Sequence, residues 1–256
     1  FKVSEMAKKL KFPLQCIGIP KTVDNDLPFT DCSPGFGSVA KYVATSTLEA
    51  GLDVKSMAET STKVFILEVM GRHAGWIAAA SCLAATEAGD PPHIILLPEV
   101  PFEKGKFISQ VKQTIKNNGY CVIVASEGTQ TKNGKFLADS GLTDAFGHKQ
   151  LGGVAPVLAS MISKIGLKNH WAVADYLQRS ARHVASKTDL DQAYAVGKHA
   201  VKLAISGETA VMPIIKRISN TPYKWKIETA PLKNIANVEK TMPKKFISNN
   251  GFEITS

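Results

Sequence analysis

Residues 18–26 read Gly-Ile-Pro-Lys-Thr-Val-Asp-Asn-Asp and bring one ammonium group and two carboxylates into a single short segment. Lys21 offers a compact positive charge for a phosphate, while Asp24 and Asp26 can accept a proton or associate with magnesium. In an extended segment residues 24 and 26 project to the same side, where their charges repel unless a cation lies between them. The segment therefore suits phosphate chemistry; a loop whose aspartates cap the next helix is the alternative.

Further polar residues follow runs that read as buried strands. The run 63–70 ends in Met70 and breaks at Gly71 and Arg72, and the run 120–125 is followed closely by Glu127. Arg72 offers a bidentate donor fork for phosphoryl oxygens, and the Glu127 carboxylate is an acceptor suited to hydroxyl groups. Tyr176 and Arg179 follow a third such run, 169–174. A surface arginine that caps a turn is the structural alternative for Arg72, and an N-cap-like loop residue is the alternative for Glu127.

Strand and helix patterns alternate around these residues. Apolar spacing predicts helices over 38–52, 76–88, 103–117, 153–165 and 189–207, and strands over 14–19, 63–70, 93–97, 120–125, 169–174 and 210–215. Such alternation indicates an α/β protein with doubly wound, three-layer units. The turn at residues 33–38, Ser-Pro-Gly-Phe-Gly-Ser, points backbone N–H groups either at a phosphate or at a structural partner. The basic tail, including Lys240, reads as a solvated surface.

The chain of 256 residues has 44% hydrophobic and 21% charged residues, with a formal net charge of +9. That charge favours an anionic partner, but no basic motif with interleaved aromatic residues appears, so we expect no nucleic-acid partner. No apolar run is long enough for a membrane span and no signal peptide opens the chain, so no membrane association is expected. Cys16, Cys32, Cys82 and Cys121 form no CxxC pair, which favours a reducing cytoplasm.

The segment 18–26 resembles the active-site segment of the phosphofructokinase family. The resemblance implies that Asp24 takes the proton from the 1-hydroxyl of fructose 6-phosphate and that Asp26 supports this base or a Mg²⁺ cofactor. Lysine at position 21 is similar to the pyrophosphate-dependent branch, whereas ATP-dependent members usually carry glycine there. Lys21 would fill the space that a nucleotide's inner phosphate needs and would suit compact pyrophosphate. Thr22 belongs to the same motif and is expected to bind substrate.

The triplet Met70-Gly71-Arg72 resembles the family's second signature, in which the arginine contacts the transferred phosphoryl group. Glu127 matches the glutamate that binds the sugar hydroxyls, and Tyr176 and Arg179 match the residues that hold the sugar phosphate, although Ser180 and Ala181 replace the glycines common in relatives. Lys63 stands where many relatives have an arginine that reaches the 6-phosphate across a subunit interface. The resemblance therefore also implies a homodimer or homotetramer.

The resemblance implies two similar αβα Rossmann-like domains, the first incomplete. We expect residues 1–36 to be a remnant of a phosphoryl-donor domain, 37–178 the sugar-phosphate domain, 179–218 a return to the donor domain, and 219–256 a segment packing on the sugar domain. The family's glycine-rich donor loop, with its main magnesium-binding aspartate, does not occur here, and the sequence begins at Phe1. We therefore expect an amino-terminally truncated chain with little activity alone.

Two other functions remain open at this stage. An ATP-dependent 6-phosphofructokinase differs from the first interpretation mainly at Lys21. A non-catalytic regulatory subunit that binds sugar phosphate could share the fold, but it has no chemical need for Asp24 and Asp26 together.

Overall fold

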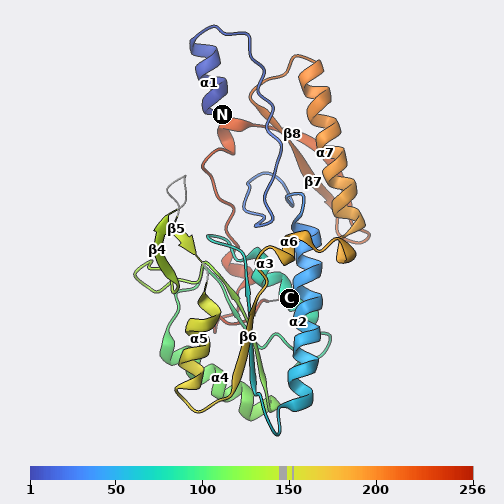
Figure 1. Ribbon diagram of the computed structural model, residues 1–256. Helices are drawn as coiled ribbons and strands as arrows, with labels where there is room; N and C mark the ends of the chain where they lie inside the picture. The colour runs from blue at the N-terminus through green and yellow to red at the C-terminus, as the bar shows by residue number, and fades with distance from the viewer. Residues whose placement is uncertain (144–148, 152, 256) are drawn as a thin grey trace. The chain divides into compact units, whose positions relative to one another are not determined.

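The chain divides into two compact units. The computed structural model describes residues 1–143, 149–151 and 153–255 (Figure 1). Unit 1 comprises residues 1–38 and 185–240, and unit 2 comprises residues 39–184 and 241–256. The expected assignment of 219–240 to the sugar domain is wrong, because this stretch contains the second strand of a hairpin that pairs along its length within unit 1. Only residues 241–256 return to unit 2.

Unit 2 is built on a parallel sheet of four strands in the order β2-β3-β1-β6. These strands are β1 (Val64–Val69), β2 (Ile94–Leu96), β3 (Cys121–Ser126) and β6 (Asn169–Val173). The interior strands β1 and β3 are buried almost throughout, as expected for a parallel sheet covered on both faces. This arrangement confirms the predicted α/β class. Because all four strands are parallel, the segments that follow them emerge at the same edge.

Helices cover both faces of this sheet. Helices α4 (Lys104–Asn118) and α5 (Val154–Ser163) pack on one face, where Phe107 and Leu158 are fully buried against the strands. Helix α2 (Phe36–Met57) packs on the other face through Val54, near Tyr120 and Val122. The remaining helices and turns of unit 2 are α3 (Trp76–Ala80), η1 (Ser81–Ala84), α6 (Leu177–Ser180), η2 (Arg182–Val184) and η4 (Lys244–Phe246). A separate strand pair consists of β4 (Asp139–Thr143) and β5 (Lys149–Leu151).

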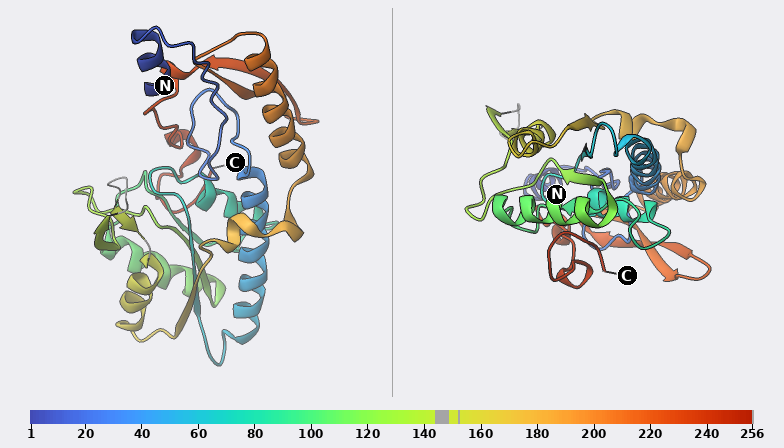
Figure 2. Two further views of the ribbon diagram at one scale, coloured as in Figure 1. Left: turned by 45° about the horizontal axis from the view of Figure 1, so that its top comes forward. Right: turned by 90° about the horizontal axis from the view of Figure 1, so that it is seen from below.

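Unit 1 has fewer elements, which agrees with the expectation of an incomplete first domain. It contains α1 (Lys2–Lys9), α7 (Lys187–Ile205), the antiparallel hairpin of β7 (Val211–Ser219) and β8 (Lys224–Pro231), and the turn η3 (Leu232–Asn234). Helix α7 lies along the hairpin (Figures 1 and 2). The core of this unit includes Met212, Ile214, Ala230 and Ile235. Among the described residues of the whole chain, no helix combines the length and apolar character needed to cross a bilayer.

Three sequence-based expectations fail locally. The strand expected at 14–19 is reduced to one parallel bridge between Ile17 and Val211. The helix expected over 76–88 ends at Ala84, because the Asp90 carboxylate accepts the Thr86 and Glu87 N–H groups and holds a turn instead. Strand β8 was not predicted, since its exposed lysines gave it the composition of a surface tail.

Candidate functional site

The edge where β1 and β3 end carries several of the predicted residues. The Glu127 N–H donates to the Val69 carbonyl at 2.9 Å, which continues the ladder one step beyond the strands. The Gly71 N–H lies 3.4 Å from Glu127 Oε1. The Ser126 hydroxyl also donates to the Gly71 carbonyl. These contacts bring the Met-Gly-Arg turn and Glu127 together, as the sequence predicts for the carboxyl ends of neighbouring parallel strands.

Gly128 allows the two turns to approach this closely. A Cβ atom at this position would lie 2.5 Å from the Gly71 carbonyl oxygen and closer still to that of Arg72. Gly71 itself has φ +131°, a conformation that side chains rarely permit. The backbone that carries the partly exposed Arg72 is therefore seated directly against Gly128. Sequence analysis did not single out Gly128, although its place directly after Glu127 was visible.

The segment after β6 joins the same edge through Gln178. This side chain is 2% exposed, and its Oε1 accepts from the Met70 N–H at 3.3 Å while its Nε2 donates to the Asp175 carbonyl at 2.8 Å. Gln178 thus ties the segment holding Tyr176 and Arg179 to the end of β1. Both of those side chains are exposed, and the Arg179 guanidinium carbon lies 4.1 Å from the centre of the Tyr176 ring. This cation–π contact holds the arginine over the ring. Sequence analysis missed Gln178.

Lys63 lies apart from this group within the chain. It immediately precedes β1 and so stands at the amino end of the strand that Met70 and Gly71 follow. Its Nζ donates to the Ala58 carbonyl at 2.7 Å. A strand of this length spans about 20 Å, so Lys63 and Gly71 mark opposite edges of the sheet. Its predicted role across a subunit interface remains a prediction.

The segment with Lys21, Asp24 and Asp26 belongs to unit 1 and is a tight loop. Residues 23 and 24 form a turn, and Asn25 has φ +58°, so the expectation of an extended segment is wrong. The Thr22 hydroxyl accepts the Asp24 N–H at 3.1 Å. Lys21 is exposed, Asp24 and Asp26 are partly buried, and Asn25 is 3% exposed. Asn25 therefore turns inward, whereas Asp24 and Asp26 on either side of it are only partly buried.

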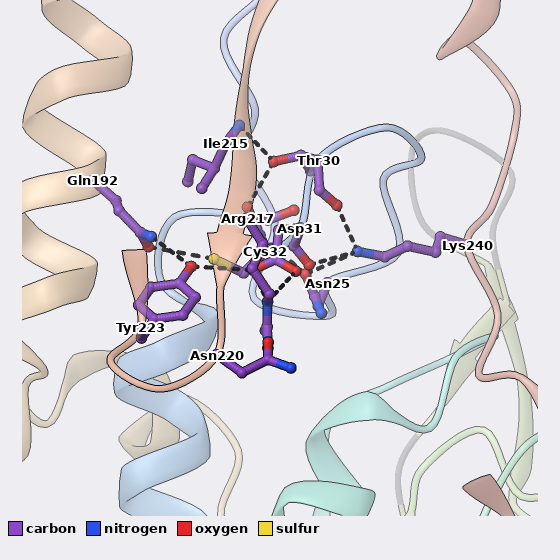
Figure 3. A network of polar contacts seen from close by, with 11 residues as sticks. Asn25, Thr30, Asp31, Cys32, Gln192, Ile215, Arg217, Asn220, Tyr223 and Lys240 are labelled. Carbon is purple, nitrogen blue, oxygen red and sulfur yellow. Dashed lines mark hydrogen bonds and ion pairs between the residues drawn. The ribbon is translucent and has the colours of Figure 1, made fainter. Parts of the chain in front are cut away.

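A network of polar contacts connects this loop to residues of the hairpin and to Lys240 (Figure 3). The Asn25 side-chain oxygen accepts the Ser33 N–H at 3.0 Å and lies 3.3 Å from Lys240 Nζ. The Arg217 Nε atom lies 2.9 and 3.1 Å from the two carboxylate oxygens of Asp31, so its one N–H group is shared between them, and the Tyr223 hydroxyl donates a hydrogen bond to the same carboxylate. The network extends from the loop through the hairpin to helix α7.

Burial shifts the pKa values of three titratable groups in this network. Desolvation lowers the pKa of Lys240, although the charges of Asp31 and Asp26 act in the opposite direction. Desolvation, reinforced by the Asp31 charge, raises the pKa of the Cys32 thiol to about 11, so the thiol is protonated at neutral pH. Desolvation also raises the pKa of the Tyr223 phenol. The expectation that Lys240 belongs to a solvated surface is wrong, because its side chain is partly buried in this network.

The turn at residues 33–38 has a protein partner. The Asp189 carboxylate, 5% exposed, accepts the Gly35 N–H at 2.8 Å and the Ser38 N–H at 3.1 Å. It also accepts the Ser38 hydroxyl at 2.6 Å. A carboxylate is a favourable partner for the amino end of a helix, and here it binds the amino end of α2. The Gly35 and Ser38 N–H groups donate to Asp189, so the structure favours a structural role for this turn over phosphate binding.

The carboxylate of Asp26 is an oxygen donor of the kind that Mg²⁺ prefers, and Asp24 lies two residues before it. Magnesium in phosphoryl-transfer sites is usually held by one or two carboxylates together with substrate oxygens and waters. The loop supplies two partly buried carboxylates of this kind. Within the described ranges, no cluster of three or more potential metal-binding side chains occurs.

The chain is similar to a known protein family and to several named proteins. A family model described as "Phosphofructokinase" matches residues 2–204. A protein of Halomonas elongata named "Pyrophosphate--fructose 6-phosphate 1-phosphotransferase" is 64% identical, over 99% of this chain and 61% of its own length. A Streptomyces coelicolor protein named "ATP-dependent 6-phosphofructokinase 3" is 32% identical, over 90% of this chain and 63% of its own length.

A solved structure is similar to this chain in both fold and sequence. The crystal structure of a pyrophosphate-dependent phosphofructokinase from Marinobacter aquaeolei superposes with a TM-score of 0.88 and is 59% identical, covering 99% of this chain and 60% of that one. The chain spans 61% of the length of three curated relatives that share 58% to 64% identity with it.

Proposed function

Because the chain belongs to the phosphofructokinase family, we propose that its full-length gene product transfers a phosphoryl group from pyrophosphate to the 1-hydroxyl of fructose 6-phosphate. The loop at residues 21–26 carries this proposal: an exposed lysine precedes two partly buried carboxylates, and the inward-turned Asn25 fixes the loop between them. The 64% identity to a protein named for this reaction supports the choice of donor and acceptor.

Asp24 is the proposed base. Its carboxylate accepts the proton of the 1-hydroxyl while the hydroxyl oxygen forms a bond to phosphorus and the bond from phosphorus to the departing phosphate breaks. Lys21 and Arg72 stabilise the charge on the phosphoryl oxygens, for which an ammonium and a guanidinium fork are suited. Asp26 holds Mg²⁺ or supports Asp24. Magnesium, when bound, neutralises charge on the donor phosphates.

The sugar is the proposed ligand of the edge residues of unit 2. The Glu127 carboxylate accepts hydrogen bonds from sugar hydroxyls, while the Met70 and Gly71 turn limits where the sugar can lie. Tyr176 and Arg179 hold the 6-phosphate, and the cation–π contact between them restricts the arginine to fewer conformations before binding. Thr22 binds substrate beside Asp24. Lys63 is proposed to reach the 6-phosphate of a neighbouring subunit.

The proposed reaction is readily reversible, because pyrophosphate and the sugar bisphosphate have comparable phosphoryl energetics. We place it in glycolysis, in the cytoplasm, and in a homodimer or homotetramer. The cytoplasmic assignment is supported by the four cysteines, which are all free thiols. The oligomer is supported by the resemblance of Lys63 to the arginine with which many relatives reach the 6-phosphate across a subunit interface.

The experiment that tests this proposal measures product formation by the full-length protein with fructose 6-phosphate, Mg²⁺, and either pyrophosphate or ATP. We expect fructose 1,6-bisphosphate with pyrophosphate and little with ATP. Asp24→Asn should lower kcat about 10²- to 10⁴-fold, the usual contribution of a general base. Asp53→Asn, at an exposed aspartate of α2, is the matched control and should leave kcat unchanged.

Two outcomes would contradict the proposal. Activity with ATP alone would retain the family but overturn the donor. Binding of fructose 6-phosphate without turnover by either donor would support a regulatory sugar-phosphate-binding subunit instead.

A further inference from the structure

Lys240 is the last residue of unit 1 and contacts the loop that carries Asp24 and Asp26. Its backbone N–H donates to the Asp26 carbonyl at 2.6 Å. Its Nζ lies 2.9 Å from the Thr30 carbonyl, 3.1 Å from the Asp31 carbonyl and 3.3 Å from the Asn25 side-chain oxygen. All four acceptors belong to residues 25–31. Figure 3 shows the ammonium group of Lys240 pointing into this loop.

The number of N–H groups on the Lys240 ammonium equals the number of loop oxygen atoms near it. A lysine has three N–H groups, and three oxygen atoms of the loop lie within hydrogen-bond distance of Nζ. The side chain is partly buried, where hydrogen bonds to a charged group are worth more than at the surface. Two of these oxygens are backbone carbonyls, so their contacts fix the path of the chain. Lys240 therefore acts on the shape of the loop.

The far end of the same loop has an anchor that does not involve Lys240. The Asp31 N–H donates to the Ile215 carbonyl at 2.8 Å, and the Ile215 N–H donates to the Thr30 hydroxyl at 3.1 Å. Arg217 adds the ion pair to Asp31. Strand β7 therefore holds residues 30 and 31 independently. At the other end of the loop, the Asn25 side-chain oxygen contacts Ser33 and Lys240, and the Asp26 carbonyl accepts from the Lys240 N–H.

The backbone conformation of Asn25 depends on the hydrogen bonds that its side chain makes with Ser33 and Lys240. Its φ of +58° is uncommon for a residue with a side chain, although asparagine adopts it more readily than most. The buried side-chain oxygen shared by Ser33 N–H and Lys240 Nζ holds Asn25 in place. If Asn25 relaxes, the carboxylates on both sides of it change direction.

We propose that Lys240 is a positioning residue for the reaction, which fixes the loop bearing Asp24 and Asp26 through its contacts with residues 25–31. This inference rests on the function proposed above and extends it to a residue far away in the sequence. Because the Lys240 ammonium is directed at protein oxygens, it orders the carboxylates without serving as a ligand for either phosphate substrate.

The test compares Lys240→Met, Lys240→Arg and the control Lys233→Met in the full-length protein. Methionine keeps the apolar stem and removes the donors, whereas arginine keeps donors and charge. Lys233 is an exposed lysine in η3. For Lys240→Met we expect kcat to fall about 10- to 100-fold, the scale of a misplacement near 1 Å, with KM for both substrates changed less than about threefold. Lys240→Arg should retain more of kcat, and Lys233→Met should match the unmodified protein.

Hydrogen exchange supplies a second measurement that does not depend on turnover. In Lys240→Met, the amides of residues 24–33 should exchange faster, while those of the hairpin β7–β8 and of helix α7 should keep their protection. A merely structural role would instead speed exchange across unit 1 and lower the active fraction without changing kcat per active site.

Three results would overturn the inference. If kcat of Lys240→Met stays within about twofold of the unmodified protein, the loop does not need Lys240. If kcat is unchanged while KM for pyrophosphate or fructose 6-phosphate rises about tenfold, Lys240 contacts substrate directly. If the unmodified protein turns over neither donor, the proposed function itself has failed, and the positioning role fails with it.

Discussion

Gly128→Ala tests whether the close seating of the Arg72 turn matters for the reaction. The added Cβ would lie 2.5 Å from the Gly71 carbonyl oxygen, against the 3.4 Å at which ordinary van der Waals contact begins. Gly71 must then retreat by about 0.9 Å, and Arg72, whose carbonyl is closer still, by more. Both neighbours are backbone atoms, so the clash cannot be relieved by rotating a flexible side chain. The turn that presents Arg72 must move.

A displacement of about 1 Å at a group that stabilises the transition state costs about 10²-fold in rate. We therefore expect kcat of the full-length Gly128→Ala protein to fall about 10²-fold with pyrophosphate as donor. The assay is the initial rate of fructose 1,6-bisphosphate formation at saturating substrates. Circular dichroism and hydrogen exchange of residues 121–126 establish that strand β3 remains folded.

Gly105→Ala is the matched control. This glycine lies in helix α4, and a Cβ there would have no heavy atom within 4 Å. The substitution should leave kcat unchanged, because the added methyl group would meet no side chain or backbone atom outside its own helix. A Gly128→Ala protein with kcat within about twofold of the unmodified protein would refute the reasoning, since the turn would then tolerate the displacement.

Two further predictions concern the donor and the dependence of stability on pH. Lys21→Gly should lower kcat/KM for pyrophosphate at least about tenfold, because a charge beside the donor is removed; an unchanged ratio of pyrophosphate to ATP use would show that Lys21 does not select the donor. His93 Nδ1 accepts the Val122 N–H at 2.9 Å, and burial lowers the pKa of this imidazole below its ordinary 6.5. The unfolded chain therefore binds a proton more readily than the folded one, so the stability contributed by neutral His93 is present above pH 6.5 and is lost as the pH falls below it. Urea unfolding at pH 8 and pH 5 should show a larger loss of stability for the unmodified protein than for His93→Gln, and equal losses would contradict this account.

The sequence predicts the parallel sheet and the residues at its carboxyl edge because both are local patterns. Apolar runs mark β1 and β3, and the residues that follow them, Gly71 and Glu127, are placed by the geometry of parallel strands. The strand–turn–helix order then determines which side chains share an edge. No long-range contact has to be known for this inference.

The residues that hold the candidate site in place could not be predicted from local patterns, because each of them acts through a contact between distant parts of the chain. Gln178 reaches Met70 across 108 residues, Asp189 reaches Gly35 across 154, and Lys240 reaches Asn25 across 215. A glutamine, an aspartate and a lysine have no periodicity that reveals a buried partner, and their composition favours a surface assignment. The extended conformation expected for residues 24–26 failed for a related reason: the left-handed Asn25 is stabilised by Ser33 and Lys240 rather than by its neighbours.

The reverse reaction tests the central claim most directly. The full-length protein would be incubated with fructose 1,6-bisphosphate, Mg²⁺ and isotopically labelled inorganic phosphate, and the appearance of labelled pyrophosphate would be followed. A pyrophosphate-dependent enzyme transfers the 1-phosphoryl group to inorganic phosphate, so we expect labelled pyrophosphate and fructose 6-phosphate in equal amounts. Absence of labelled pyrophosphate from a protein that phosphorylates fructose 6-phosphate with ATP would contradict the account.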